Sequence, residues 1–254
     1  MNRLVLAKIF FRSFFISATL NFRRMQNMGF AMAMIPVIRE WNLTQSDAAK
    51  FLTSHLQMFN THPYFSASVV GSVVRLEEEQ IKEKGNNPST DAVAIKQVLE
   101  GPYAAIGDTF FWGALRPFAA IVSCVLAYMG YVLAPLAFLV LYMPAHIWVR
   151  LKGFLEGYRR GKQGIEFIRM LDLPRNAVNI RWASLVVLAG WSAFGLNSNG
   201  NLSFIDLSDI AIKLVAIAII LVCIGLIKKR ISQIYILYSS ALIFLIISLK
   251  DFLN

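Results

Sequence analysis

The sequence predicts an all-α integral membrane protein. Of its 254 residues, 57% are hydrophobic and only 16% are charged. The mean hydropathy is +0.56, and together these values are too apolar for an ordinary soluble domain. The formal net charge is +10, but the basic residues lie beside apolar runs, as the positive-inside rule expects. They do not form an aromatic-rich basic patch, so we expect no nucleic-acid partner.

We divide the chain into four segments. The first is an amphipathic helical region (1–100), and the second carries a GDTFFW motif and broken membrane helices (101–149). A basic cytoplasmic segment (150–181) and C-terminal membrane helices (182–254) complete the chain. Cys124 and Cys223 lie inside apolar runs without metal-ligand spacing, so we interpret them as small buried hydrophobic residues. We expect no metal and no cofactor.

The first helix is predicted over residues 4–35, ended by Pro36. Lys8 and Arg12 interrupt its apolar start, so we do not expect a cleaved signal peptide. A polar stripe at three- and four-residue spacing favours a helix lying in the membrane interface or against a partner, rather than a spanning one. The stripe consists of Ser13, Ser17, Asn21 and Arg24.

A second helix is predicted to begin at Thr44 or Ser46, with Asp47 completing a capping pattern. It should end within the segment FNTHPY, residues 59–64.

The residues before Pro63 are predicted to form a turn, because proline disfavours helix at the residue that precedes it. Asn60, Thr61 and His62 would then present exposed hydrogen-bonding groups. Such groups suit the hydroxyls of a sugar, and they suit a helix C-cap equally well.

A polar stretch follows a small apolar one at residues 66–84, and we expect Glu77, Glu78 and Glu79 on a solvated helix face. Residues 85–90 (GNNPST) should form a turn. Ser89 or Thr90 can cap a short helix that stops at Gly101–Pro102.

The segment GPYAAIGDTFFWGALRP (101–117) organises the rest of the chain, because it stands at the mouth of a long apolar run. Asp108 is predicted as a helix N-cap. Asp108, Trp112 and Arg116 would then share one helix face, with the two charges roughly 12 Å apart. Each charge needs water, a partner or a ligand. The alternative is a capping aspartate and an interfacial arginine.

Residues 117–149 contain no formal charge and are interrupted by Gly130, Pro135 and Pro144. Splitting the run near Gly130 leaves pieces shorter than the roughly 20 residues a spanning helix needs. We therefore predict a hairpin of broken or re-entrant helices, which is tolerated where it is buried in protein or lines a wet cavity.

The basic segment contains Gly153, Gly157 and Gly161 at four-residue spacing, which lets a helix approach a neighbour closely. Residues 211–227 and 231–249 are predicted as a membrane hairpin with a cytoplasmic basic turn at 228–230.

With these stretches in view, the chain resembles the IID membrane component of the mannose/fructose/sorbose family of the sugar phosphotransferase system (PTS). The most specific matches are FNTHP and GDxxFWGxxRP. The segments that carry the resemblance are FFRSFF (10–15), NFRRMQNMGFAMAMIP (21–36), HLQMFNTHPY (55–64), AIKQVLEGPYAAIGDTFFWGALRP (94–117) and GYRRG (157–161).

This resemblance implies a multi-pass subunit of the bacterial inner membrane that pairs with a IIC membrane subunit. The pair moves a hexose, while soluble IIA and IIB proteins phosphorylate it; higher oligomers of IIC–IID pairs are expected. The family's phosphorylated groups are on IIA and IIB, so this chain would have no catalytic residue of its own.

The chain departs from the family's usual pattern at several positions. Arg23 stands where a glutamate is usual, and Val98, Glu100 and Ala105 replace expected Gly, Met and Gly. A second reading is therefore a scaffold or regulatory relative that has lost transport. An intramembrane enzyme is a third, but the three histidines lack a nucleophile–base arrangement and an H-E-x-x-H motif.

Seven residues are candidates for function. Asn60, Thr61, Asp108 and Trp112 are candidates for sugar binding or a gate. Three others are candidates for contact with a partner subunit or lipid: Asn21, Arg24 and Arg116.

Overall fold

The computed structural model describes residues 1–198 together with 218, 222, 225–226, 229 and 238–239. The chain divides into two compact units, Met1–Phe194 and Gly195–Asn254. The structural description below concerns the first unit. The predicted C-terminal hairpin lies largely outside the described residues, as does Cys223.

The first unit is helical, with no strand among the described residues. The elements in chain order are α1 (Arg3–Ser13), η1 (Ile16–Thr19), α2 (Asn27–Glu40), α3 (Gln45–His55), α4 (Ser66–Lys84), α5 (Thr90–Gly107), η2 (Asp108–Leu115), α6 (Arg116–Tyr128), α7 (Ala134–Arg160), η3 (Gly161–Gln163), α8 (Gly164–Met170) and α9 (Leu173–Ser198).

The predicted helix over 4–35 is wrong, because the chain turns back between α1 and α2. Met25 has a φ of 56°, and it exchanges backbone hydrogen bonds with Asn21 at 2.9 and 3.0 Å. Gln26 N–H then bonds to the Phe59 carbonyl at 2.8 Å. The four polar residues therefore form no stripe: Ser13, for example, is buried and donates to the Phe10 carbonyl. Pro36 lies inside α2 and does not end it.

The capping prediction for α3 is confirmed. Thr44 is the N-cap, and its hydroxyl accepts from Asp47 N–H at 3.2 Å. The helix ends at His55, earlier than predicted, because the chain enters the turn that pairs with Met25.

The expected solvated face of α4 is wrong for two of its three glutamates. Glu77 is fully buried and Glu78 is 3% exposed. Glu77 Oε1 lies 3.1 Å from His55 Nε2, while its Oε2 accepts from Ser89 N–H at 3.0 Å. Ser89 caps α5, as predicted. The carboxylate thus joins the end of α3 to the start of α5, a buried role that a local run of glutamates does not reveal.

The buried Lys96 ammonium completes this junction. Its Nζ donates to the carbonyls of His55 and Gln57 at 2.8 and 3.3 Å and lies 4.6 Å from the centre of the Phe30 ring. These bonds satisfy carbonyls that the C-terminal end of α3 leaves free.

Helices α4 and α7 cross closely because glycines face one another's backbones, as the four-residue spacing predicted. A Cβ at Gly157 would overlap the Ser68 carbonyl oxygen, and one at Gly71 would overlap the Phe154 carbonyl oxygen. Gly153 lies over the Ser68 side chain. Gly161 ends α7 with a φ of 56°, a conformation that favours glycine.

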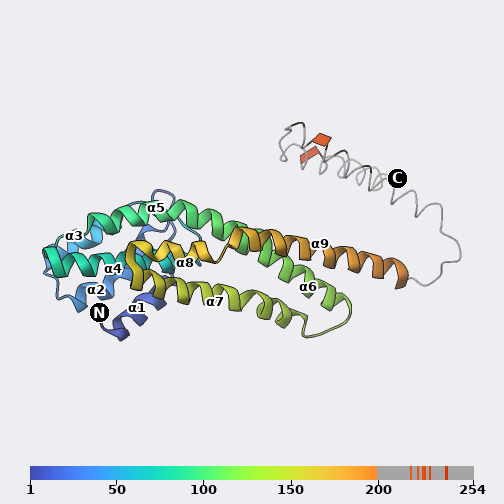
Figure 1. The fold of residues 1–254 in the computed structure, drawn as a ribbon, viewed down its shortest axis with the longest axis horizontal. Coiled ribbons are helices and arrows are strands. Elements are labelled where there is room, and N and C mark those ends of the chain that lie inside the picture. The colour runs from blue at the N-terminus through green and yellow to red at the C-terminus, as the bar shows by residue number, and fades with distance from the viewer. Residues whose placement is uncertain (199–217, 219–221, 223–224, 227–228, 230–237, 240–254) are drawn as a thin grey trace, which may run out of the picture. The chain divides into compact units, whose positions relative to one another are not determined.

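The hairpin predicted after Pro117 is present, but its arms are long. Gly101–Pro102 does not stop the helix, so α5, η2 and α6 form one helical run over Thr90–Tyr128. The second run covers Ala134–Trp191, and both are long and apolar enough to cross a membrane. Gly130, with a φ of 86°, turns the chain between them. The predicted sub-spanning lengths are therefore wrong. Figure 1 shows α6 and α7 projecting together from the N-terminal helices.

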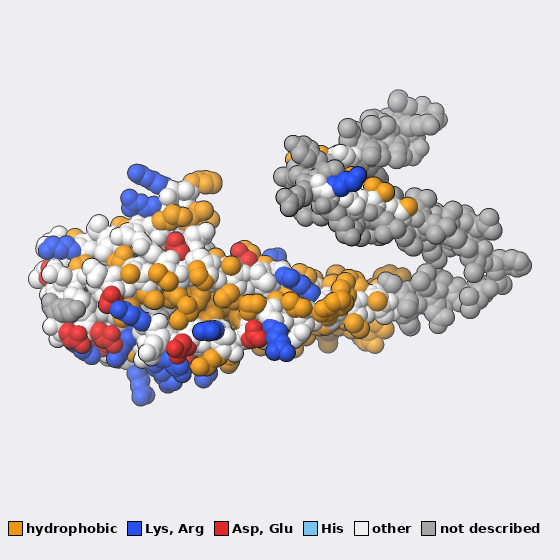
Figure 2. All heavy atoms as spheres, turned by 45° about the horizontal axis from the view of Figure 1, so that its top comes forward, with side chains coloured by type: hydrophobic (Ala, Val, Ile, Leu, Met, Phe, Trp, Pro, Cys, Tyr) orange, Lys and Arg blue, Asp and Glu red, His pale blue; other side chains and the backbone are white. Residues whose placement is uncertain are grey.

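The surface of the first unit is divided by polarity. In Figure 2 charged side chains gather over the N-terminal helices, while hydrophobic side chains cover the visible face toward the hairpin. Cys124 of α6 is exposed on this subunit, which corrects the prediction that it is buried. Its helix face is apolar enough to meet lipid or another protein.

Candidate functional site

Three segments that are far apart in the sequence meet around His62. They are the turn after Phe59, the start of η2 and the middle of α7. The His62 ring stacks on Phe111 with ring centres 5.4 Å apart and lies 4.7 Å from Trp112. A Cβ at Gly107 would overlap the imidazole, so this glycine admits the ring.

The buried His62 ring is held in one neutral form. Its Nδ1 accepts a hydrogen bond from Tyr64 N–H at 3.3 Å, which places the proton of the neutral ring on Nε2. Nε2 is buried and has no hydrogen-bond partner among the described residues. Burial, with a smaller contribution from the charge of Arg150, lowers the pKa of His62 to about 4.

We expect the protein to lose stability as the pH falls from 6.5 to 4.5. Burial also lowers the pKa of His55, so the unfolded chain binds more protons at both histidines. Stability is complete above the unfolded pKa near 6.5 and falls as the pH drops, with His62 contributing on the order of 3 kcal/mol by pH 4. Hydrogen bonds from the terminal ammonium, Tyr158 and Lys82 overcome burial and lower the pKa of Glu78 to about 2, so Glu78 contributes only below 4.5.

Thermal unfolding of the chain co-purified with its IIC subunit, between pH 7.5 and 4.5, measures this loss. His62→Phe keeps an aromatic ring that cannot titrate, so its slope against pH should be shallower, with the remainder due to His55 and other titrating groups. Equal slopes in the two proteins would contradict the role of His62.

A second group of side chains extends the site along α7. Tyr142, His146 and Arg150 recur every four residues and face Tyr64 of the turn. The Tyr64 and Tyr142 hydroxyls lie 2.9 Å apart, and the His146 ring lies 4.5 Å from the Tyr64 ring. The sequence signal was this four-residue spacing within an apolar run, which our sequence analysis missed.

Arg150 is the most unusual member of this group. It is 5% exposed, and its guanidinium lies 4.3 Å from the Phe14 ring centre and 5.2 Å from that of Tyr64. Its Nε and Nη1 are buried without a hydrogen-bond partner among the described residues. A buried charge without a carboxylate is costly, so the site offers donors to a carboxylate, phosphate or hydroxyl. Our sequence analysis placed Arg150 in a cytoplasmic loop.

The exposed turn predicted before Pro63 is correct only for Asn60. Thr61 and His62 are 3% and 1% exposed. The Gln26 amide bonds to both backbone groups of Thr61, at 3.0 and 2.9 Å, and buries them. The Asn60 N–H bonds to Glu100 Oε2 at 3.2 Å. The turn is therefore held by side chains from two other segments, which local sequence does not encode.

Asp108 is not a helix N-cap, because the helix continues through it. It begins η2, a π-helix whose residues DTFFWGAL contain most of the predicted motif. π-Helical turns are rare and are frequent at functional sites. Arg181 Nε of α9 bonds to the Gly113 carbonyl within this segment at 3.1 Å, which fixes α9 against η2.

Asp108, Trp112 and Arg116 are all exposed, as a shared free face requires. Within the part of the chain that the structure describes, the Asp108 carboxylate makes no hydrogen bond or ion pair. No hydrogen bond joins it to Asn60 or Thr61 there, so the two predicted segments meet through His62, which packs on Gly107 and Trp112. Asp108 remains a candidate for ligand contact.

The residues predicted to contact a partner or lipid have different surroundings. Asn21 Nδ2 bonds to Asn27 Oδ1 at 2.8 Å and supports the turn between α1 and α2. Arg24 is exposed but donates to the Leu56 carbonyl at 3.2 Å. Arg116 is exposed at the start of α6 and remains available to a partner.

The chemistry of the site is that of recognition. Aromatic faces, a neutral imidazole and hydroxyl groups surround it, and sugars bind to such faces and to neutral donors and acceptors. Among the described residues, no group of three or more His, Cys, Asp or Glu side chains is arranged to hold a metal ion. The His55 ring lies 3.1 Å from the Glu77 carboxylate, but this pair belongs to the buried junction of α3, α4 and α5.

Comparisons with known proteins identify the family and the fold. The model of the PTS system mannose/fructose/sorbose family IID component matches residues 1–253. The chain is 35% identical over 157 residues to the PTS system mannose-specific EIID component of Escherichia coli (strain K12), covering 60% of this chain and 54% of that protein. It is 35% identical over 173 residues to the fructose permease IID component of Bacillus subtilis (strain 168), covering 67% and 60%. The matches thus span little more than half the length of these relatives.

Solved structures share the fold. A chain described as the structure of a membrane protein superimposes with a TM-score of 0.74 at 25% identity, over 99% of this chain and 96% of that one. A chain from a complex of the mannose transporter ManYZ with microcin E492 gives a TM-score of 0.60 at 24% identity, over the same shares. The match of the family model along almost the whole sequence shows that the chain belongs to the mannose/fructose/sorbose family of PTS IID components.

Proposed function

We propose that this chain is the non-catalytic IID subunit of a sugar translocation complex. It pairs with a IIC subunit and moves a mannose-type hexose across the bacterial inner membrane as a multi-pass protein, for phosphorylation by IIA and IIB. The observation that carries this proposal is the π-helical GDTFFWG segment. In it the exposed Trp112 ring lies beside the buried His62, and the exposed Asp108 carboxylate has no partner among the described residues. Family membership supports the rest.

The need for a partner follows from exposed apolar residues between α1 and α2. Leu20 is 61% exposed and the Phe22 ring is fully exposed, although both lie outside the two spanning runs. Large exposed apolar patches mark protein or membrane contacts. The Arg150 guanidinium is 5% exposed and is covered by the Phe14 ring, so contact with a carboxylate of the IIC subunit requires this ring to move. Pairs of one IIC and one IID subunit would then assemble into the proposed higher oligomer.

A scaffold that has lost transport is the second candidate, and the departures from the family pattern favour it. Arg23 and Ala105 are exposed, where a partner or ligand would meet them. Glu100 instead has a structural contact, because its carboxylate accepts from Asn60 N–H. A IID-deficient strain distinguishes the two: the transport subunit restores hexose uptake when produced with its IIC subunit, whereas the scaffold restores assembly alone.

We expect the subunit to be unstable without IIC. Expressed alone, it should be protease-sensitive or aggregated in mild detergent, because the exposed apolar surface has no partner. Expressed with IIC, it should elute as one species and resist the same protease. A lone subunit that is monodisperse and protease-resistant would contradict the proposed pairing.

A further inference from the structure

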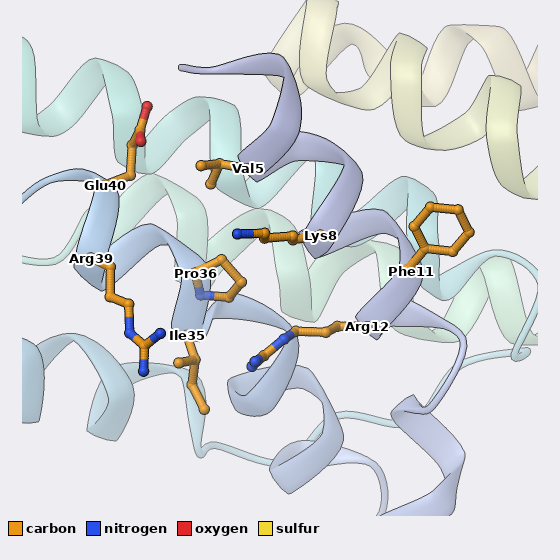
Figure 3. A pocket seen from close by; sticks show the side chains of 8 residues that line it. All are labelled: Val5, Lys8, Phe11, Arg12, Ile35, Pro36, Arg39 and Glu40. Atoms are coloured by element: carbon orange, nitrogen blue, oxygen red, sulfur yellow. The ribbon is translucent and has the colours of Figure 1, made fainter.

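A basic groove lies between α1 and α2, next to exposed aromatic residues of the N-terminal helices. The groove has a volume of about 550 Å³. Figure 3 shows Lys8 and Arg12 reaching from α1 toward α2, with Pro36 and Ile35 forming an apolar wall and Arg39 and Glu40 at the C-terminal end of α2. Three cations and one carboxylate therefore converge on an apolar surface.

Arg12 makes a structural hydrogen bond in this groove. Pro36 has no N–H, so the Met32 carbonyl four residues earlier lacks its helical partner. Arg12 Nη1 donates to this carbonyl at 3.0 Å. The bond fixes α1 against α2 and holds the guanidinium over the groove.

The other two cations are free. Among the described residues, neither the Lys8 ammonium nor the Arg39 guanidinium makes a hydrogen bond or an ion pair. The Glu40 carboxylate is already engaged, since its Oε1 accepts from Asn2 N–H at 2.9 Å. The groove thus has an excess of positive charge with unused donors, which suits a phosphate.

The surroundings identify the source of that phosphate. Helices α1 and α2 are antiparallel, because Asn2 contacts Glu40 at one end and Arg12 contacts Met32 toward the other. Phe11, Phe15, Met28 and Met32 are 64%, 68%, 50% and 49% exposed and lie toward the second end. Arg12 lies beside these apolar side chains, while Lys8 and Arg39 lie farther toward the first end. Cations and exposed apolar side chains are therefore adjacent on this helix pair, as an element lying at the acyl–headgroup boundary requires.

We propose that this groove binds the phosphate headgroup of an anionic phospholipid, with the acyl chains lying along the exposed aromatic and methionine side chains. Lys8 and Arg39 contact the phosphate, and Arg12 supplies positive charge while holding the Met32 carbonyl. A soluble phosphate would meet the same cations but would gain nothing from the exposed apolar side chains.

Native mass spectrometry of the detergent-purified full chain, co-purified with its partner subunits where they are retained, tests this proposal. Phosphatidylglycerol and phosphatidylcholine with the same acyl chains are titrated separately. The variant is Lys8→Gln/Arg39→Gln, and its control is Lys50→Gln/Arg169→Gln, which removes two exposed cations outside the groove. Each cation near an anionic headgroup contributes about fivefold, so the variant should bind phosphatidylglycerol about 25-fold more weakly and the control should bind like the parent.

A variant that is expected to bind the lipid more tightly distinguishes a direct effect on binding from misfolding of the protein. Glu40→Gln keeps an oxygen for Asn2 N–H and removes a negative charge, so phosphatidylglycerol should bind about fivefold more tightly. Unchanged binding in either groove variant overturns the proposal, as does equal binding of phosphatidylcholine. Displacement of phosphatidylglycerol by millimolar inorganic phosphate would assign the groove to a soluble anion instead and would also overturn it.

Discussion

Gly157→Ala is expected to lower the unfolding temperature of the subunit by about 5–10 °C. The added Cβ would overlap the Ser68 carbonyl oxygen and approach Ser72 N to 3.0 Å, and neither is a flexible side chain. Overpacking of this kind costs about 1–3 kcal/mol or more, and each kcal/mol shifts the unfolding temperature of a protein this size by about 2–4 °C. Thermal unfolding of the chain co-purified with its IIC subunit in detergent measures the shift.

Gly190→Ala is the matched control. Gly190 lies inside α9, and apart from its own helix backbone and chain neighbours no atom lies within 4 Å of an added Cβ. Alanine is favoured over glycine in a helix by about 1 kcal/mol, so this variant should unfold at a slightly higher temperature. If both variants behaved alike, the close crossing of α4 and α7 would not govern stability.

Asp108→Asn is expected to reduce sugar uptake by about ten- to a hundredfold while assembly with IIC survives. The carboxylate is exposed in the π-helix without an internal partner, so its loss should not disturb the fold. A charge-assisted hydrogen bond to a ligand contributes about 1.5–3 kcal/mol, which corresponds to that loss of affinity. Uptake of labelled hexose and co-purification with IIC are measured in the same strains.

Asp172→Asn makes the same chemical change at another exposed aspartate and should transport normally. Asp172 has a φ of 41°, a conformation that asparagine also adopts. Dissociation of the Asp108→Asn complex would show that Asp108 is structural, and unchanged uptake would remove it from the site altogether.

Local signals in the sequence predicted the features that depend on neighbouring residues. The helix caps predicted at Thr44 and Ser89 are confirmed, because a cap depends only on the next three residues of the chain. The prediction that the glycines of α7 allow a close helix crossing was correct, because their four-residue spacing follows the helix period. The break between α1 and α2 was missed because it depends on Phe59 and on the left-handed conformation of Met25.

The sequence was limited in the same way in predicting the candidate site. Sequence reasoning selected the FNTHP turn and the GDTFFWG segment, which the structure brings together through His62. It could not predict the π-helix, because a helical period does not reveal which backbone hydrogen bond each residue makes. It missed Arg150, because a charge that ends an apolar run has the same pattern whether it is buried or faces water.

Co-purification from native membranes tests the central claim most directly. The chain, tagged at its chromosomal locus, is extracted in mild detergent, and its partners are identified by mass spectrometry. We expect a IIC subunit in constant ratio to the chain, retained through size exclusion, and hexose uptake after reconstitution of that complex with IIA and IIB. Recovery of the chain without IIC, or of a stable IIC complex that transports no hexose, would contradict the proposal that it is a working IID subunit.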